Sequence, residues 1–290
     1  MLRPSQQHMC LLVAATVATG SLLHAFGTLA SSDSVFASKT NPLNTVFAKY
    51  AWGWTSLPLL LFMILHASSS LSSGSTSSNT ITTNAIRNAA ARWIGATLYW
   101  ALLTQWALGN PLLDRVLLAT GDCRIPSSSS STISANAFSI RQCKSMGGSL
   151  TGLDISGHCF LLVHAILLIS EELRPYFSLH FDTSHSATTS IHSRTASHAS
   201  RMVMSILAVI LVTLAVIWWM MLLATCIYFH SFAETFPGTL LGMLYWAVLY
   251  VASARIYPDL LPVDFNNMDD HAAPLVDIAA VPHPKSKKRS

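Results

Sequence analysis

Two histidines occupy matching positions around neighbouring apolar segments. His158 ends the motif DISGH (154–158) directly before one apolar stretch, and His230 ends the motif YFH (228–230) directly after the next. If both stretches cross a membrane, they run antiparallel because a single loop joins them. The start of the first and the end of the second then face the same side. We therefore predict that the two imidazoles lie close together.

Such a pair suits phosphoryl transfer that needs no metal and no cofactor. One imidazole attacks phosphorus, and a second, protonated imidazole gives its proton to the leaving oxygen. Gly157 allows the backbone to approach a ligand closely, while Ser156 and the amides after it can form an anion-binding helix N-terminus. Asp154 lies four residues before His158 and would fix the tautomer of that ring if the helix already includes it.

The composition indicates an integral membrane protein. Charged residues make up 10% of the chain and hydrophobic residues 51%, with a mean hydropathy of +0.46, whereas soluble domains carry about 25% charged residues. A membrane-spanning helix needs roughly 20 apolar residues. The sequence offers six such stretches, at about 9–30, 46–67, 91–108, 150–170, 202–229 and 238–256. These predict an all-α integral membrane fold with six transmembrane helices.

The first stretch has an alternative interpretation as a cleaved signal peptide. Arg3 precedes it, and it includes the small residues Gly27, Ala30 and Ser31, which is typical of such peptides. Its apolar run is longer than the usual core of a signal peptide. This length favours a membrane-spanning helix.

The distribution of Lys and Arg predicts the orientation, because these residues favour the cytoplasmic side of short loops. Six spans place both termini on one face, together with the loops after the second and fourth spans, and this face holds eleven of the 17 Lys and Arg residues. We therefore predict that both termini are cytoplasmic. His158 and His230 then face the opposite, non-cytoplasmic side.

The basic residues at the C-terminus account for much of the net charge of +4. They are concentrated in 285–290, so the charge indicates no nucleic-acid-binding surface. A basic tail of this kind is typical of a segment that lies against acidic headgroups. Lys287 and Lys288, the fourth and third residues from the end, also look like a dilysine retrieval signal for the endoplasmic reticulum.

The remaining segments are polar loops around a transmembrane domain of residues 1–258. We predict Ser-rich cytoplasmic loops at about 67–90 and 173–201, a lumenal loop at about 109–149 and a disordered basic cytoplasmic tail at 259–290, since such compositions bury no core. The loop before the fifth span contains four histidines, but their spacings match no familiar set of ligands. We predict no metal site.

The five cysteines fall into two groups. Cys10, Cys159 and Cys226 lie in or beside apolar stretches, where cysteine usually acts as a small buried hydrophobe. Cys123 and Cys143 bracket the lumenal loop, and the lumen of the secretory pathway is oxidising. A disulfide between them would contribute roughly 3 kcal/mol to stability; a disulfide and two free thiols both remain open.

The triplet Ser156, Gly157, His158 resembles the second motif of the lipid phosphate phosphatases, in which the histidine is the general acid. His230 then matches the nucleophile of their third motif, and Glu234 stands at the spacing of their orienting aspartate. The chain departs from that pattern in two ways. It has no Ser-Arg pair before His230 and no Lys-x6-Arg-Pro motif to bind the phosphate.

A closer resemblance extends from residue 41 to residue 258. The residues that carry it are Asn41, Leu43, Asn44, Phe47, Lys49, Ala51, Trp52, Trp54, Thr55, Thr120, Gly121, Cys123, Gln142, Cys143, Gly147, Gly148, Asp154 to His158, Phe160, Leu161, Leu162, Glu171, Glu172, Tyr228, Phe229, His230, Gly238, Thr239, Leu240, Gly242, Trp246, Tyr257 and Pro258. In these positions the chain resembles the fat storage-inducing transmembrane family of endoplasmic reticulum proteins.

This resemblance implies a function as well as a fold. It implies a six-span reticulum protein with cytoplasmic termini that supports lipid droplet formation and membrane lipid homeostasis. It also implies a lumen-facing acyl-CoA diphosphatase that splits long-chain acyl-CoA into acyl 4′-phosphopantetheine and adenosine 3′,5′-bisphosphate, with His230 as nucleophile and His158 as general acid. Family members are further described as binding di- and triacylglycerol.

Elementary energetics agree with a reaction at the membrane surface. Each buried CH₂ of an acyl chain contributes roughly 0.8 kcal/mol, so the chain stays in the bilayer and its diphosphate stays at the interface. Lys49, expected on the same face, is a candidate to bind phosphate oxygens, with Arg124, Arg141 and Lys144 behind it. Alternatively, Lys49 only extends its ammonium to the headgroups.

Two other function classes remain. One is a non-catalytic protein that binds neutral glycerolipids and concentrates them where lipid droplets form. The other is a small transporter, which the sequence favours less because no span besides those near the histidines carries paired internal charges and the broken-repeat pattern of transporters is absent.

Overall fold

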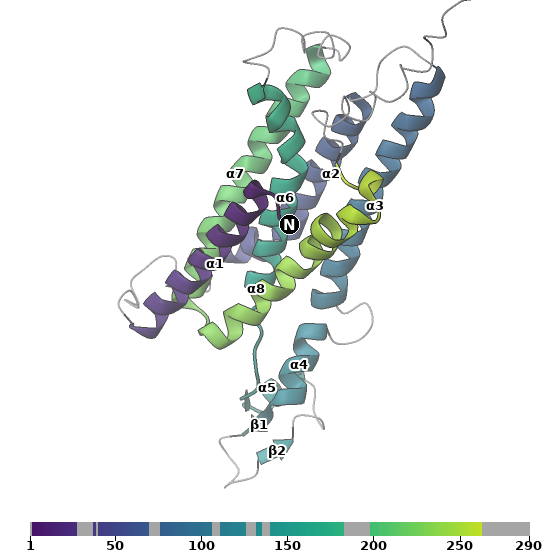
Figure 1. The fold of residues 1–290 in the computed structure, drawn as a ribbon. Helices are drawn as coiled ribbons and strands as arrows, with labels where there is room; N and C mark the ends of the chain where they lie inside the picture. Colours follow the sequence, from purple (N-terminus) through teal and green to yellow (C-terminus); the bar gives the residue numbers. More distant parts are fainter. Residues whose placement is uncertain are drawn as a thin grey trace, which may run out of the picture.

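The computed structural model describes residues 2–27, 37–38, 40–69, 76–105, 111–125, 132–134, 140–182 and 198–262. Long helices form a bundle, and a small unit lies beyond one of its ends (Figure 1). The helices of the bundle are α1 (Pro4–Ala25), α2 (Ala51–Ser69), α3 (Thr76–Thr104), α6 (Gly157–Asp182), α7 (His198–Tyr228) and α8 (Phe232–Trp246). A π-helical turn, Leu43–Ala48, leads into α2, and another, Ala247–Ala252, continues α8.

Four of the described helices are long and apolar enough to cross a membrane: Pro4–Ala25, Ala51–Ser69, His198–Tyr228 and Phe232–Arg255. The other two predicted spans correspond to α3 and α6. Helix α3 begins among Ser, Thr and Asn residues, and the second half of α6 contains Glu171, Glu172 and Arg174. Their apolar stretches are therefore shorter than the helices themselves.

Several predicted boundaries differ from the structure. Helix α6 begins at Gly157 and not near residue 150, because the residues before it form strand and extended backbone. Helix α3 begins at Thr76, inside the predicted loop 67–90, and α6 continues to Asp182, inside the predicted loop 173–201. Residues 183–197, with two of the four loop histidines, lie outside the described residues.

The first residues of the predicted tail contact the bundle. Asn88 Nδ2 donates a hydrogen bond to the carbonyl of Asp259 at 2.7 Å, and Arg92 Nη1 donates one to the carbonyl of Leu260 at 2.8 Å. The chain is thus fixed against α3 at least as far as Leu260. Residues 263–290 lie outside the described part of the chain.

Helix α6 is the central element of the bundle. It packs against α2, α7 and α8, and every side chain from Cys159 to Ile169 is buried. A helix that is apolar all round needs neighbours on all sides, which explains why the apolar half of α6 has no exposed face. The residues at its N-terminal end are consequently held by several other helices.

Two glycines allow α8 to approach α6 closely. A Cβ atom at Gly238 would lie 2.5 Å from the carbonyl oxygen of Ser156, and one at Gly242 would lie 2.7 Å from the carbonyl oxygen of Phe160. Real Cβ atoms do not come so close to backbone atoms. Small residues four positions apart are a common means of bringing membrane helices together, so the sequence GTLLG (238–242) sets the distance between α8 and α6.

Two adjacent carboxylates on α6 tie its second half to the rest of the bundle. Glu172 pairs with Arg92 of α3 at 2.7 Å and accepts a hydrogen bond from Tyr250 at 2.5 Å. Glu171 accepts hydrogen bonds from Gln6 of α1 at 2.7 Å and from Trp246 at 3.1 Å. Both glutamates are almost completely buried. Buried carboxylates persist only where such partners compensate for the lost water.

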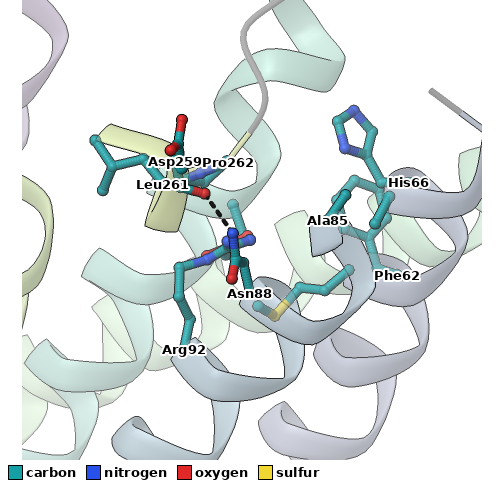
Figure 2. Close-up of a pocket in the computed structure, with 11 residues that line it drawn as sticks. Phe62, His66, Ala85, Asn88, Arg92, Asp259, Leu261 and Pro262 are labelled. Atoms are coloured by element: carbon teal, nitrogen blue, oxygen red, sulfur yellow. Dashed lines mark hydrogen bonds and ion pairs between the residues drawn. The ribbon is translucent and has the colours of Figure 1, made fainter. Parts of the chain in front are cut away.

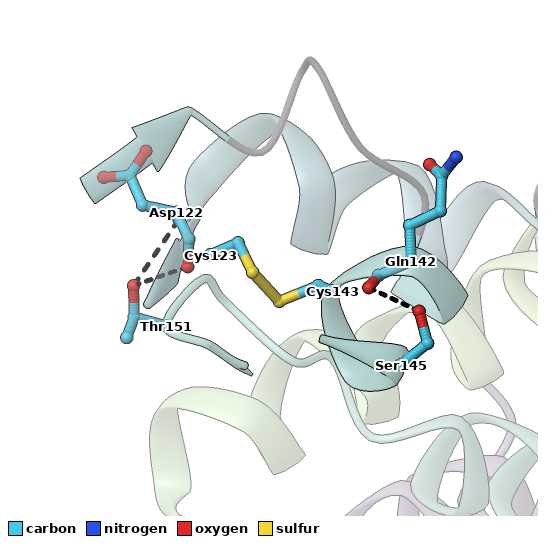
Figure 3. Close-up of a disulfide and its surroundings, with 6 residues drawn as sticks. All are labelled: Asp122, Cys123, Gln142, Cys143, Ser145 and Thr151. Carbon is cyan, nitrogen blue, oxygen red and sulfur yellow. Dashed lines mark hydrogen bonds between the residues drawn. A yellow bond between two sulfur atoms is a disulfide. The ribbon is translucent and has the colours of Figure 1, made fainter. Parts of the chain in front are cut away.

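The small unit follows α3 and lies at the end of the bundle where α6 begins (Figure 1). It contains α4 (Leu112–Thr120), α5 (Ile140–Ser145) and the strands β1 (Asp122–Arg124), β2 (Thr132–Ser134) and β3 (Ser149–Leu150). The strands form an antiparallel sheet in the order β2-β1-β3. Cys123 of β1 is joined to Cys143 of α5 by a disulfide (Figure 3).

We expect Gly238→Ala to destabilise the protein, because the added methyl group meets backbone and cannot be accommodated without separating α8 from α6. Overpacking of this kind costs about 1–3 kcal/mol. The measurement is the apparent melting temperature of the purified protein in detergent, which should fall. Gly53→Ala is the matched control, since a Cβ at Gly53 meets nothing within 4 Å. Equal melting temperatures for the two variants would contradict the assignment.

Candidate active site

The N-terminal ends of α6 and α8 meet at one end of the bundle. The backbone N–H of Ser156 donates a hydrogen bond to the carbonyl of Glu234 at 3.0 Å. Ser156 lies two residues before His158, and Glu234 lies four residues after His230. The structure therefore places the two histidine motifs in direct contact through their neighbours.

His158 is the second residue of α6, just before the fully buried stretch that starts at Cys159. The hydroxyl of Ser156 accepts a hydrogen bond from the N–H of Cys159 at 3.3 Å and so caps this helix. The imidazole of His230 lies near enough to His158 for the charge of one ring to act on the other.

His230 lies in the short turn between α7 and α8. Its Nδ1 is 3.5 Å from Oε2 of Glu234, and its side chain is 20% exposed. The same carboxylate oxygen accepts hydrogen bonds from the N–H of Ser231 at 2.8 Å and from its hydroxyl at 2.9 Å. These bonds hold Glu234 in place at the first turn of α8. The carboxylate therefore fixes one side of the His230 ring and leaves Nε2 for another partner.

The start of α6 also provides backbone donors. The N–H groups of Gly157 and His158 belong to the first turn, where a helix offers no acceptor of its own. Within the part of the chain that the structure describes, neither group has another acceptor. Two such groups beside two imidazoles can receive phosphate oxygens. The hydroxyl of Ser156 is already engaged in the helix cap.

Asp154 does not lie one helical turn before His158, where it could have fixed the tautomer of that ring. Because α6 begins at Gly157, Asp154 precedes the helix and has no helical i, i+4 relation to His158. It is exposed and lies near the small unit. There, burial raises the pKa of Asp114, Asp154 raises it further, and Lys144 opposes the shift. Asp154 is therefore part of a charge cluster with α4 and α5.

The small unit is held against the start of α6 by backbone contacts. Thr120 Oγ1 accepts a hydrogen bond from the N–H of Leu153 at 2.9 Å, and a Cβ at Gly121 would lie 2.3 Å from the backbone nitrogen of Gly152. Thr151 exchanges hydrogen bonds with Asp122 beside the disulfide (Figure 3). The segment leading to His158 is thus anchored to a disulfide-bonded unit.

The cationic residues that the sequence suggested for binding phosphate lie outside the helices of the bundle. Lys49 lies just before α2 and is exposed, with its Nζ 5.7 Å from the centre of the Tyr50 ring. Arg124 and Lys144 are exposed on the small unit, and the side chain of Arg141 lies outside the described residues. None of the contacts of Lys49 in the described structure links it to the histidines.

Three further histidines lie on the described helices and make contacts away from the histidine pair. His24 forms a hydrogen bond through Nδ1 with the carbonyl of Ile227 at 2.9 Å. His164 is fully buried against the rings of Trp52, Tyr99, Phe160 and Tyr245. His66 lines a small cavity beside Arg92 and Asp259 (Figure 2). Glu172, in the wall of that cavity, lies about 21 Å along α6 from His158, so the cavity is separate from the histidine pair.

Three residues that the sequence singled out for other reasons also position the site. Gly238 and Gly242 set the distance between the two helices, and the backbone of Glu234 binds the segment before His158. The spacing of the two glycines was a readable signal of close helix packing. No cluster of three or more His, Cys, Asp or Glu residues is arranged to hold a metal ion in the described ranges.

Comparison with known proteins places this site in a family. The family model for fat storage-inducing transmembrane protein matches residues 32–250. The chain belongs to this family. The matched region includes both histidines, the small disulfide-bonded unit and both glycines of α8. The family resemblance predicted from the sequence is confirmed.

Several members of the fat storage-inducing transmembrane family that are similar to this chain are named as enzymes. Acyl-coenzyme A diphosphatase FITM2 of Xenopus laevis is 33% identical over 245 residues, which cover 84% of this chain and 82% of the relative. Acyl-coenzyme A diphosphatase fit1 of Schizosaccharomyces pombe is 31% identical over 245 residues, 84% of this chain and 83% of the relative. Acyl-coenzyme A diphosphatase FITM2 of Homo sapiens is 30% identical over 239 residues, which cover 81% of this chain and 78% of the relative. No solved structure matches the chain.

Proposed function

We propose that this protein is a lumen-facing fatty acyl-CoA diphosphatase of the endoplasmic reticulum membrane. The observation that carries the proposal is the meeting of the His158 and His230 motifs at one end of the bundle, where the N–H of Ser156 donates a hydrogen bond to the carbonyl of Glu234 at 3.0 Å. The names of the relatives supply the reaction class, since each is called an acyl-coenzyme A diphosphatase. The products would be acyl 4′-phosphopantetheine and adenosine 3′,5′-bisphosphate.

In the proposed mechanism, Nε2 of His230 attacks one phosphorus of the diphosphate. Glu234, on the opposite side of the ring at 3.5 Å from Nδ1, stabilises the positive charge that develops on the imidazole. His158 gives its proton to the oxygen that leaves as the phosphoanhydride bond breaks. Water then cleaves the phosphohistidine, with His158 accepting the proton from that water.

The charges at the site fit this division of labour. Positive charges on two neighbouring imidazoles oppose each other. A bound diphosphate brings negative charge between the rings, which favours the proton that His158 must carry as the general acid. The N–H groups of Gly157 and His158 would receive phosphate oxygens.

We further propose a six-span topology with both termini in the cytoplasm. Helices α3 and α6 would be the two spans that complete the four apolar ones, and α6 and α7 would then run antiparallel with both histidines on the lumenal side. The disulfide at the same end of the bundle supports this orientation, because disulfides persist in oxidising compartments. Lys49 enters this proposal as a residue that contacts the substrate diphosphate from the same side.

We expect His158→Ala and His230→Ala each to remove nearly all hydrolysis of oleoyl-CoA by the purified protein. Loss of a nucleophile or a general acid lowers the rate at least about 100-fold, because neither imidazole can replace the other. The measurement is the release of adenosine 3′,5′-bisphosphate without added metal. His8→Ala is the matched control, since His8 is an exposed residue near the start of α1 and its loss should leave the rate unchanged. Full activity in both site variants would refute the proposal.

A second candidate function is suggested by the family description, which names fat storage. We propose that the reaction supports lipid droplet formation and that the transmembrane domain also contacts neutral glycerolipids. A purely lipid-partitioning protein would need only the second property. The two candidates make opposite predictions for the histidine variants in cells.

We expect neither His158→Ala nor His230→Ala to restore lipid droplets in cells that lack the parent protein. The physical reason is that both substitutions spare the lipid-facing surface and remove only the imidazoles. Droplets are counted by neutral-lipid staining at matched protein levels, with wild type and His8→Ala as controls. Full restoration by both variants would favour the non-catalytic, lipid-binding function.

A further inference from the structure

Two cysteines lie in contact directly beside the histidine site. The sulfur atoms of Cys159 and Cys226 are 3.9 Å apart, and both side chains are completely buried. Cys159 follows His158 on α6, and Cys226 lies four residues before His230 near the end of α7. The pair therefore connects the two helices that carry the proposed catalytic residues, although the sequence suggested only two small buried hydrophobes.

The surroundings hold both cysteines in this arrangement. A Cβ at Gly20 of α1 would lie 2.5 Å from the Cβ of Cys226, and a Cβ at Gly238 of α8 would lie 3.3 Å from the Cβ of Cys159. Helix α1 thus packs against Cys226, and helix α8 packs against Cys159. The thiols are free in the structure, whereas Cys123 and Cys143 are already joined.

We propose that Cys159 and Cys226 form a reversible redox pair in which the dithiol is the active form and the disulfide the inactive form. A disulfide has a sulfur to sulfur distance of about 2.05 Å. Bond formation must therefore bring the two sulfurs together from 3.9 Å. Any part of this closure that side-chain rotation does not supply displaces α6 and α7 next to both histidines. In-line phosphoryl transfer tolerates little displacement, and a shift of about 1 Å can cost 100-fold in rate.

Both side chains are closed to water and to lipid alike, so oxidation requires a local opening of the helix contact. The oxidant that suits a site between membrane helices is an organic hydroperoxide formed on a lipid chain, because an apolar oxidant partitions into the membrane. One sulfur attacks the distal peroxide oxygen, which releases the alcohol and leaves a sulfenic acid. The second sulfur displaces the sulfenic oxygen as water and forms the disulfide. Two thiols and one hydroperoxide thus give one disulfide, one alcohol and one water, and the two electrons reduce the peroxide.

The test uses the purified full-length protein in detergent with cumene hydroperoxide as the probe. After treatment, free thiols are alkylated and the protein is digested for mass spectrometry. We expect a peptide pair linked through Cys159 and Cys226, and a fall of at least about tenfold in oleoyl-CoA hydrolysis. Dithiothreitol should restore the rate, and untreated protein given the same dithiothreitol controls for any effect on the Cys123 to Cys143 bond.

Two variants separate the pair from other cysteines. Cys10→Ala should keep the full response, because Cys10 lies elsewhere on α1. The double variant Cys159→Ala, Cys226→Ala should keep its activity within about twofold after peroxide treatment. Complete alkylation of Cys159 and Cys226 after treatment would overturn the proposal, and so would a linked peptide in fully active enzyme.

The activity readout of this inference rests on the proposed diphosphatase function, whereas the mass spectrum does not. A linked peptide in protein that never hydrolyses oleoyl-CoA would contradict the proposed function and support the redox pair. Hydrolysis that is unaffected by peroxide, with both thiols alkylated, would contradict the redox pair alone.

Discussion

The close approach of α8 to α6 is the constraint on which the rest of this structure depends. Membrane helices gain little from hydrophobic burial against each other, so van der Waals contact and interhelical hydrogen bonds must hold them. Gly238 and Gly242 make that contact possible, and the hydrogen bond from Ser156 to Glu234 fixes its register. Because His158 and His230 flank these residues, the same contact determines how far apart the imidazoles lie.

Helix α6 is held in place at its start and again near its middle, which makes it a suitable support for a reacting group. At its start, the Ser156 cap and the disulfide-bonded unit restrain the backbone before His158. Further along, Glu171 and Glu172 bind residues of α1, α3 and the C-terminal segment. Removing one partner of a buried pair costs about 3–5 kcal/mol, so these contacts resist movement of the helix. Catalytic geometry of the proposed kind requires such rigidity.

The sequence could predict those features that depend on composition and chain direction. Apolar stretches located the helices, and the single loop between the fourth and fifth stretches placed His158 and His230 at one end. Features that depend on tertiary contact were harder to predict. Leu150 pairs with Cys123 in the small sheet, so this part of the predicted fourth span is a strand and α6 begins only at Gly157. Helix α3 begins at Thr76 although the sequence there is rich in Ser and Thr. The contact between Cys159 and Cys226 depends on the packing of four helices, which the sequence alone does not reveal.

The most direct test of the central claim is an experimental structure of the purified protein with bound orthovanadate, which mimics a phosphorus atom during in-line transfer. We expect vanadium bonded to Nε2 of His230, with a ring nitrogen of His158 about 3 Å from the opposite apical oxygen. Vanadate bound elsewhere, or two imidazoles separated by packed side chains, would contradict it.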